Sequence, residues 1–236
     1  MMTSKTLTPS DWDSIHLVVF DVDGTLYRQR QLRLRMARDM LLYALFKRDI
    51  NVIAVLATYR GIRERLGDEE AIEFERVLIA ETAAATDNSP DTVRSIVAEW
   101  VERRPLPYLA GCRYPGLPRL FAGLRRRGKS IGILSDYPAE AKLRALGLTA
   151  DHIVYAGDDG IGVLKPHPRG LESMIAMAGV NVETTVVIGD RPDRDGLVAL
   201  RAGARVLIRS SRRIEGWQTF ARFDDPLFAP FLTSCS

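Results

Sequence analysis

The sequence predicts a doubly wound α/β fold, in which a parallel sheet forms the core and an all-helical domain is inserted into it. The first observation is a set of short, unbroken apolar runs, typical of strands buried on both faces. The second is that helical patterns alternate with the later runs, as in Rossmann-like sheets. The third is that about 110 residues separate the first two runs, far more than one crossover helix needs.

The strands are expected where the apolar runs lie, at 16–20, 130–134, 152–156, 185–189 and 204–208. Helical patterns between the later runs cover 138–146, 168–179 and 195–202. Each of these helices ends near a glycine that can serve as a C-cap, namely Gly147, Gly179 and Gly203.

Residues 114–128 supply the crossover helix between the first two strands, which leaves residues 28–111 as the insertion. The core domain is therefore expected to comprise 1–27 and 112–236. Within the insertion, helices are expected near 31–47, 50–66, 69–86 and 89–105. The last has Ser89 as N-cap and Pro90 at its first position, and its apolar residues recur on one face.

Two apolar segments call for an interpretation of their own. The tract 40–59 is interrupted by Lys47, Arg48 and Asp49, so it does not read as a membrane span, which needs about 20 mostly apolar residues. We expect it to be buried in the helical bundle; a membrane surface or a prenyl chain is the less favoured alternative. The C-terminal aromatics are expected to pack on the edge of the core, or else to form an oligomer or partner contact: Trp217, Phe220, Phe223, Phe228 and Phe231.

Composition excludes several classes of protein. The 33 basic and 30 acidic residues leave a net charge of +3, so we expect no nucleic-acid partner. Three histidines and two cysteines rule out a Cys/His metal cage. Cys112 and Cys235 lie far apart, which argues against a disulfide framework, and the N-terminal segment lacks the apolar core of a signal peptide. We therefore expect a cytoplasmic protein, as a monomer or homodimer.

The most informative stretch is FDVDGTL at 20–26, directly after the first strand. Asp21 ends the strand and Asp23 follows two residues later, while Gly24 permits a sharp turn and the close approach of a substrate. Two such carboxylates can divide the work of nucleophile and proton donor. The alternative is an ordinary Asp-Gly turn with solvated acids.

A matching acidic loop, GDRPDRD at 189–195, follows the fourth strand. Asp190 is expected at the same sheet edge as Asp21, with Asp193 and Asp195 in the loop that follows. Clustered carboxylate oxygens suit Mg²⁺. The alternative is that these acids pair with the arginines nearby: Arg191, Arg194 and Arg201.

Two smaller signals complete the set. Ser135 ends the second strand and offers a hydroxyl and a backbone N–H to an anion, although serine at this position is also common as a cap. Lys165 lies in the apolar, proline-containing segment GVLKPHP and is one of only five lysines in a chain with 28 arginines. That setting favours a charge-neutralising role.

Together these residues resemble the haloacid dehalogenase superfamily of phosphohydrolases. The resemblance covers the whole core, and the insertion is similar to the helical cap of that family. Its four motifs occur in order as DVDGTL (21–26), Ser135, Lys165 and GDRPDRD (189–195). The sequence departs from many relatives at Asp136, where asparagine is common, and we expect this acid to point away from the substrate or to bind a lysine or arginine.

The resemblance implies roles for the matching residues. Asp21 would be the nucleophile that forms an aspartyl-phosphate, and Asp23 the general acid/base, whose backbone carbonyl also helps hold Mg²⁺. Asp190 would be a metal ligand together with Asp21. The transferring phosphoryl group would be bound by Ser135, Lys165 and the motif residues Gly24 and Thr25, and Asp195 would orient Lys165.

Asp23 decides between the reactions of this family, because dehalogenases lack an acid two residues after the nucleophile. A Mg²⁺-dependent phosphatase acting on a phosphorylated small molecule is favoured; a phosphomutase, a lipid or prenyl phosphate phosphatase and a low-turnover regulatory module are the alternatives. The arginines at the cap entry are interpreted as a solvated helix face rather than as a site for a second anion: Arg28, Arg30, Arg33 and Arg35.

Overall fold

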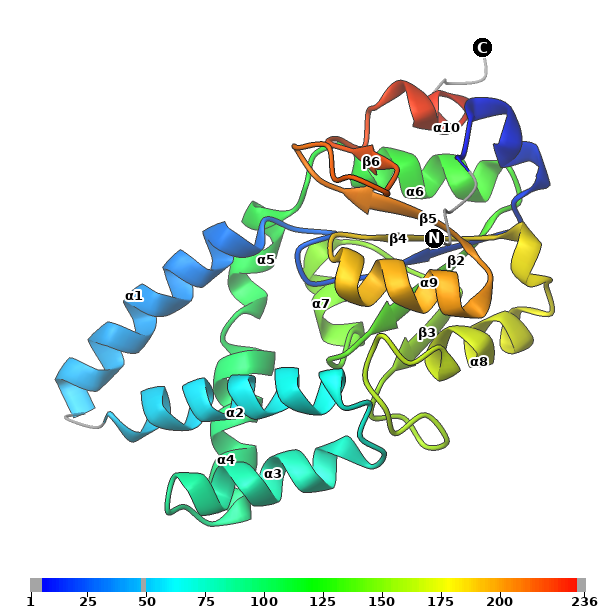
Figure 1. Ribbon diagram of the computed structural model, residues 1–236. Helices are drawn as coiled ribbons and strands as arrows, with labels where there is room; N and C mark the ends of the chain where they lie inside the picture. The colour runs from blue at the N-terminus through cyan, green and yellow to red at the C-terminus, as the bar shows by residue number, and fades with distance from the viewer. Residues whose placement is uncertain (1–5, 48–49, 233–236) are drawn as a thin grey trace.

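The computed structural model describes residues 6–47 and 50–232 and contains a six-stranded parallel sheet within them (Figure 1). The strand order is β3-β2-β1-β4-β5-β6. The strands are β1 (Leu17–Phe20), β2 (Ser130–Ser135), β3 (His152–Tyr155), β4 (Thr185–Gly189), β5 (Arg205–Arg209) and β6 (Thr219–Phe220). The five predicted strands are confirmed to within a residue or so at their ends, and the two-residue β6 was not anticipated.

Helices cover both faces of the sheet, which explains the unbroken apolar runs. Val18 and Phe20 of β1 pack into one apolar cluster with α6 (Leu117–Arg126), whereas Leu17 and Val19 pack into a second cluster with α8 (Arg169–Ala178) and α9 (Leu197–Ala202). Alternate residues of a strand point to opposite faces, so burial of both sets requires a helical layer on each side. Figure 1 shows α6 on one side of the sheet and α8 and α9 on the other.

The later helices end as predicted. Helix α7 (Glu140–Leu146), α8 and α9 are each followed by a glycine in the left-handed conformation: Gly147, Gly179 and Gly203. A π-helical turn over Pro192–Gly196 precedes α9, so the regular helix begins two residues later than predicted.

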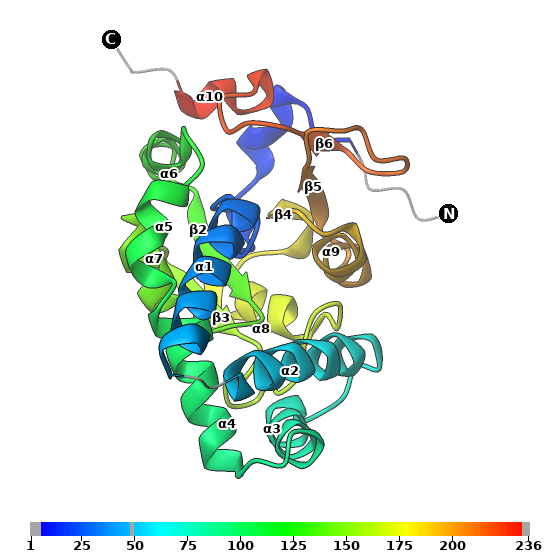
Figure 2. The same cartoon turned by 90° about the vertical axis from the view of Figure 1, so that its left-hand side faces the viewer.

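The insertion is helical and leaves the core through two neighbouring linkers. Its helices are α1 (Gln29–Lys47), α2 (Asn51–Asp68), α3 (Phe74–Ala85), α4 (Pro90–Val97) and α5 (Leu106–Cys112). Tyr27 and Arg113 form an antiparallel bridge between the outgoing and returning linkers. Figures 1 and 2 both show α2, α3 and α4 at the end of the molecule opposite α6 and α10 (Ala229–Leu232).

Local features explain where two helices of the insertion begin. The Ser89 hydroxyl accepts a hydrogen bond from the Thr92 N–H at 3.1 Å, which confirms it as the N-cap of α4. Helix α3 begins at Phe74 rather than near residue 69, because Glu70 and Glu73 adopt positive φ angles of 51° and 52° that interrupt a helix. A π-helical turn, Ala98–Arg103, continues α4 and was not predicted.

The expectation that the tract 40–59 is buried is wrong for the end of α1 and for Ile50 at the start of the next segment. Leu45, Phe46 and Ile50 are 66%, 83% and 74% exposed, whereas Val55 and Leu56 are buried as expected. The end of α1 extends past the neighbouring helices (Figure 1), where Leu45 and Phe46 face outward. Tyr43, one turn earlier, packs on Trp100. No helix among the described residues is long and apolar enough to cross a membrane.

The C-terminal segment packs on the core edge, as predicted. Phe220, Phe223, Phe228 and Phe231 are at most 3% exposed. Trp12 joins them in an edge-to-face contact with Phe231, with ring centroids 5.0 Å apart. Cys112 is a buried free cysteine, and Cys235 lies outside the described residues.

Candidate active site

The strand order places the two acidic loops side by side. The sheet is built outward in opposite directions from β1 and β4, which makes the gap between their carboxyl ends the switch point where open α/β sheets bind ligands. Asp21 follows β1, and its N–H donates to the Ile188 carbonyl of β4 at 2.9 Å. Asp190 follows β4. Both aspartates line a cavity of about 640 Å³ that lies between the core and the helical insertion.

Asp21 is held on both carboxylate oxygens. Its Oδ1 lies 2.6 Å from Lys165 Nζ, and its Oδ2 accepts a hydrogen bond from the Thr25 hydroxyl at 2.9 Å. Lys165 Nζ is also 2.6 Å from Asp195 Oδ1. The lysine is 6% exposed, so a buried ammonium bridges two acids from different strand ends. This is the contact expected for an Asp195 that orients Lys165.

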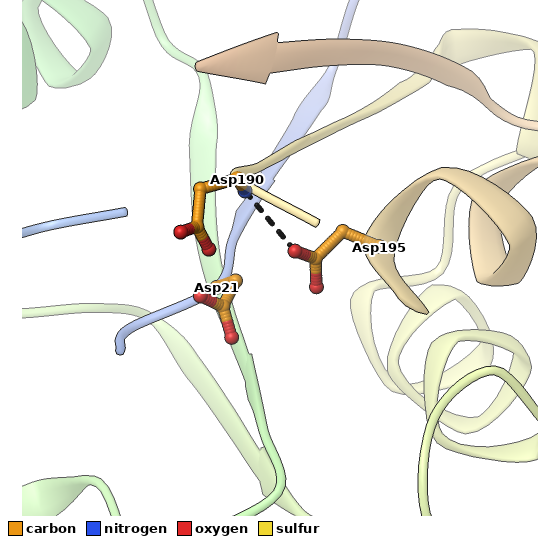
Figure 3. A group of neighbouring side chains, drawn as sticks. All are labelled: Asp21, Asp190 and Asp195. Carbon is orange, nitrogen blue, oxygen red and sulfur yellow. Dashed lines mark hydrogen bonds between the residues drawn. The ribbon is translucent and has the colours of Figure 1, made fainter. Parts of the chain in front are cut away.

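The Asp190 carboxylate lies next to Asp21 (Figure 3) and accepts few hydrogen bonds from the described residues. The Thr25 hydroxyl is 3.4 Å from Asp190 Oδ1, a long contact. In contrast, Asp195 Oδ2 accepts from the N–H groups of Asp190 and Arg191 at 3.1 and 3.0 Å. Gly24 makes the arrangement possible, because its φ is +99° and a Cβ there would lie 2.3 Å from Asp190 Oδ2.

The charges of this cluster fit a divalent cation. Oxygens of Asp21, Asp190 and Asp195 lie within 4.8 Å of one another, and Lys165 supplies one positive charge for the three carboxylates. Burial and the neighbouring Asp195 raise the pKa of Asp190 to about 6. Burial also raises the pKa of Asp21, against the opposing charge of Lys165. An all-oxygen donor set with unbalanced negative charge is the chemistry that Mg²⁺ prefers.

Asp23 lines the same cavity but is engaged by different groups. Lys142 Nζ of α7 lies 2.7 Å from both of its carboxylate oxygens, and the Tyr27 hydroxyl donates to Oδ1. Burial raises the pKa of Asp23, but the Lys142 charge and the hydrogen bonds from Lys142 and Tyr27 outweigh it, so the pKa lies below its ordinary value. Asp23 is therefore an ionised, oriented carboxylate in this state.

The other predicted site residues lie near the cavity, but only some of them line it. Ser135 is 1% exposed, and its hydroxyl accepts from the Tyr137 N–H at 3.2 Å. Gly24 and Thr25 are buried behind Asp21 and, like Ser135, are not among the cavity-lining residues. Asp136 does line the cavity, so it does not point away from it. Its Oδ1 accepts a hydrogen bond from the backbone N–H of Lys165 at 3.0 Å, not from the lysine ammonium.

The alternative interpretation of the second acidic loop holds for one residue. Asp193 is exposed and does not line the cavity, and it pairs at 2.6 Å with Arg191, which does. Arg194 pairs with Asp68 and Glu64 of the insertion at 2.6 and 3.1 Å, and it also lies 3.9 Å from Asp193. Asp193 is thus a surface partner of arginine, whereas Asp190 and Asp195 face the cavity.

A family model for haloacid dehalogenase-like hydrolases matches residues 15–203, a span that runs from β1 to the end of α9 and includes every acid described above. The chain belongs to this family.

Relatives of this haloacid dehalogenase-like hydrolase include several phosphatases. It is 29% identical to the phosphoglycolate phosphatase of Rhodospirillum rubrum over 198 residues, which cover 82% of this chain and 78% of that protein. It is 27% identical to the glyceraldehyde 3-phosphate phosphatase of Methanopyrus kandleri over 195 residues, which cover 80% and 81%. The chain is a phosphohydrolase of the family.

Solved structures of the family share its fold. CbbY from Rhodobacter sphaeroides in complex with phosphate superposes with a TM-score of 0.62 at 20% identity, covering 92% of this chain and 99% of that one. A 2-haloacid dehalogenase from Pseudomonas syringae superposes with a TM-score of 0.59 at 20% identity, covering 89% and 95%.

In this haloacid dehalogenase-like hydrolase, sequence reasoning missed several residues that face the cavity. Lys142 could have been found by the argument that singled out Lys165, because lysine is scarce in the chain. Tyr27 is directly next to the first motif. Arg33 lines the cavity, although it lies in the arginine-rich segment for which a solvated helix face is favoured over a second anion site. No local signal marked the other residues from the insertion, which reach the cavity only through the packing of α1 and α2: Leu32, Met36, Arg60 and Arg63.

Proposed function

We propose that the protein is a Mg²⁺-dependent phosphatase that hydrolyses a phosphomonoester of a small metabolite through an aspartyl-phosphate on Asp21. The observation that carries this proposal is the setting of Asp21, at the end of β1 and between Lys165 and the Asp190 carboxylate, which accepts only a long Thr25 contact among the described residues. Relatives named for phosphoglycolate and glyceraldehyde 3-phosphate support a small phosphate ester as substrate. We further propose that residues 28–111 act as the cap over this site.

In the first half of the reaction, an Asp21 oxygen attacks phosphorus and the bond to the leaving oxygen breaks. Asp23, which is ionised in the free site, first takes up a proton and then passes it to this oxygen, so that the products are a free alcohol and an acyl phosphate. Thr25 orients the nucleophile through its 2.9 Å hydrogen bond, and the Lys165 ammonium balances charge on the phosphoryl oxygens.

In the second half, a water molecule attacks phosphorus and Asp23 accepts its proton, which releases phosphate and restores Asp21. The ionised state of Asp23, held by Lys142, suits this base role. The phosphoryl group would approach Lys165 and the N–H groups that follow Ser135.

Asp21, Asp190 and the backbone carbonyl of Asp23 would hold Mg²⁺, with Asp195 behind them. The cation would supply charge neutralisation between the nucleophile and the phosphoryl oxygens. Asp195 is a weaker candidate ligand than Asp190, because Lys165 and two backbone N–H groups already occupy its oxygens.

The test is phosphate release from a panel of small phosphate esters with Mg²⁺, with EDTA as the metal-free arm. We expect Asp21→Asn to lower kcat on the order of 10³-fold or more while circular dichroism stays unchanged. Asp193→Asn is the matched control, since Asp193 is an exposed acid outside the cavity. Full activity in Asp21→Asn would refute the mechanism, and an isomerised ester without phosphate release would identify a mutase.

A further inference from the structure

The cap side of the cavity carries a buried arginine whose contacts are to neutral groups. Arg63 is 6% exposed, and it donates to the Asp136 carbonyl and, at 3.3 Å, to the Tyr59 hydroxyl. Its guanidinium lies 3.9 Å from the ring centroid of Tyr137 and 5.1 Å from that of Phe74. Within residues 6–47 and 50–232 it forms no ion pair. Burying a charge without a counterion costs free energy of folding. An anion bound beside Arg63 would offset that cost.

Two further arginines extend the positive charge across the cavity. Arg33 of α1 and Arg60 of α2 both line it, and in the part of the chain that the structure describes neither has a hydrogen bond or an ion pair. The acid that the cap contributes to the lining, Glu64, is already engaged by Arg191 at 2.9 and 3.1 Å and by Arg194 at 3.1 Å. The cap face of the cavity therefore has three arginines without a carboxylate partner.

Most acids of the core do not account for this charge, because they have cations of their own. Lys165 lies 2.6 Å from both Asp21 and Asp195, and Lys142 lies 2.7 Å from Asp23. Asp190 remains for the metal of the proposed function. Asp136 is the exception among these acids. It lines the cavity next to Arg63, and within the described residues its carboxylate forms no ion pair. It therefore offsets part of the Arg63 charge but leaves Arg33 and Arg60 unmatched. The unmatched positive charge thus comes from the helices of the insertion, whereas Lys165, which would bind the transferring phosphoryl group, comes from the core.

We propose that Arg33, Arg60 and Arg63 bind a second anionic group, a carboxylate or a phosphate, on the leaving group of the substrate. This inference rests on the proposed function for the placement of the phosphoryl group at Lys165. The cavity of about 640 Å³ accommodates a molecule of metabolite size. Met36 and Trp100 supply an apolar wall for its carbon skeleton. The preferred substrate is thus a small phosphorylated acid or a bisphosphate rather than a neutral alkyl phosphate.

Binding of non-hydrolysable phosphonates tests the site without depending on turnover. Calorimetry with Mg²⁺ would compare 4-phosphonobutanoate, which carries a carboxylate, with n-butylphosphonate, in which a methyl group replaces it. We expect the first to bind at least about tenfold more tightly, since charge-assisted hydrogen bonds are the strong ones. Arg33→Gln and Arg60→Gln should each reduce that ratio. Both side chains are exposed, so these variants avoid the folding risk of changing the buried Arg63.

Arg30→Gln is the matched control, because Arg30 is exposed on the same helix as Arg33 and does not line the cavity. It should keep the wild-type ratio. Equal affinity of the wild-type protein for the two phosphonates would overturn the inference, as would an unchanged ratio in both cap variants. A second arm, propane-1,3-diyl bisphosphonate, distinguishes a phosphate from a carboxylate as the preferred second anion.

Turnover of the matching esters, 3-phosphooxypropionate and n-propyl phosphate, separates this inference from the proposed function. Hydrolysis of both esters at similar kcat/KM, with equal phosphonate affinities, would overturn the anion site and leave the phosphatase intact. Selective binding of the carboxylated phosphonate without hydrolysis of either ester would support the anion site and count against the phosphatase.

Discussion

Replacing Lys142 by methionine is expected to destabilise the fold through the carboxylate it leaves behind. Lys142 and Asp23 are 6% and 18% exposed, and the ammonium lies 2.7 Å from both carboxylate oxygens. Removing one partner of a buried ion pair costs about 3–5 kcal/mol. Asp23 can limit this cost by taking up a proton, which at pH 7 requires about 4 kcal/mol for a carboxyl with an ordinary pKa near 3.9. We therefore expect a loss of about 3–4 kcal/mol in the free energy of unfolding at pH 7.

The loss should depend on pH in a defined direction. In the wild-type protein the pKa of Asp23 is lowered, so its ionisation stabilises the fold above the ordinary carboxyl pKa and is lost as the pH falls through the folded pKa. Without Lys142, burial raises the pKa instead, and the folded variant gains stability as the pH falls from 7 toward 5. The difference between variant and wild type should thus be largest at pH 7 and smaller at pH 5.

Urea unfolding at the two pH values, together with the pH profile of kcat/KM, measures both effects. Lys129→Met is the matched control, because the Lys129 ammonium donates to the Asp13 backbone carbonyl at 3.2 Å and forms no ion pair within the described residues. It should change stability by less than about 0.5 kcal/mol. Asp23→Asn in the Lys142→Met background should recover part of the loss, because it removes the unpaired charge. A Lys142→Met protein within about 0.5 kcal/mol of wild type at pH 7, or equally destabilised at both pH values, would refute the reasoning.

Three further predictions concern the metal site and the packing. Gly24→Ala should lower the free energy of unfolding by about 1–3 kcal/mol and weaken Mg²⁺ binding, because φ is +99° and the new Cβ would lie 2.3 Å from the Asp190 carboxylate. An unaltered Mg²⁺ affinity in calorimetry would contradict this. With the pKa of Asp190 at about 6, Mg²⁺ affinity should fall roughly tenfold per pH unit below that value, and a flat titration from pH 7 to 5 would exclude Asp190 as a ligand. In urea unfolding, Trp12→Ala should lower the free energy of unfolding by about 3–5 kcal/mol, because Trp12 is buried. Phe46→Ser should leave it within about 0.5 kcal/mol of the wild-type value, because Phe46 is exposed. Similar losses for both variants would mean that the end of α1 is covered.

Much of the core could be predicted because its signals are local. Each strand of a doubly covered parallel sheet is a continuous apolar run, and each later helix ends at a glycine in the left-handed conformation, as at Gly147. The cap helices were less predictable at their ends. The start of α3 depends on the positive φ angles of Glu70 and Glu73, and glutamate has no preference for that conformation that would have predicted it.

The exposure of α1 shows where periodicity alone misleads. An apolar face requires a partner surface, and whether one exists depends on where the helix projects. Phe46 was expected to be buried from its apolar neighbours, yet it is 83% exposed because α1 extends past the rest of the cap. Val55, in the same apolar tract, is fully buried because it lies on α2, within the bundle.

The sequence by itself determined the sheet, the helical insertion and the meeting of Asp21 with Asp190, since parallel strands bring their carboxyl ends to one edge. Only the tertiary structure decided which lysine or arginine pairs with which carboxylate. Lys142 and Asp23 are 119 residues apart, and Arg63 reaches the cavity through the docking of the cap on the core. Ion pairs and cavity walls depend on distances across the fold, and these are set by the packing of whole elements rather than by the residues beside them in the chain.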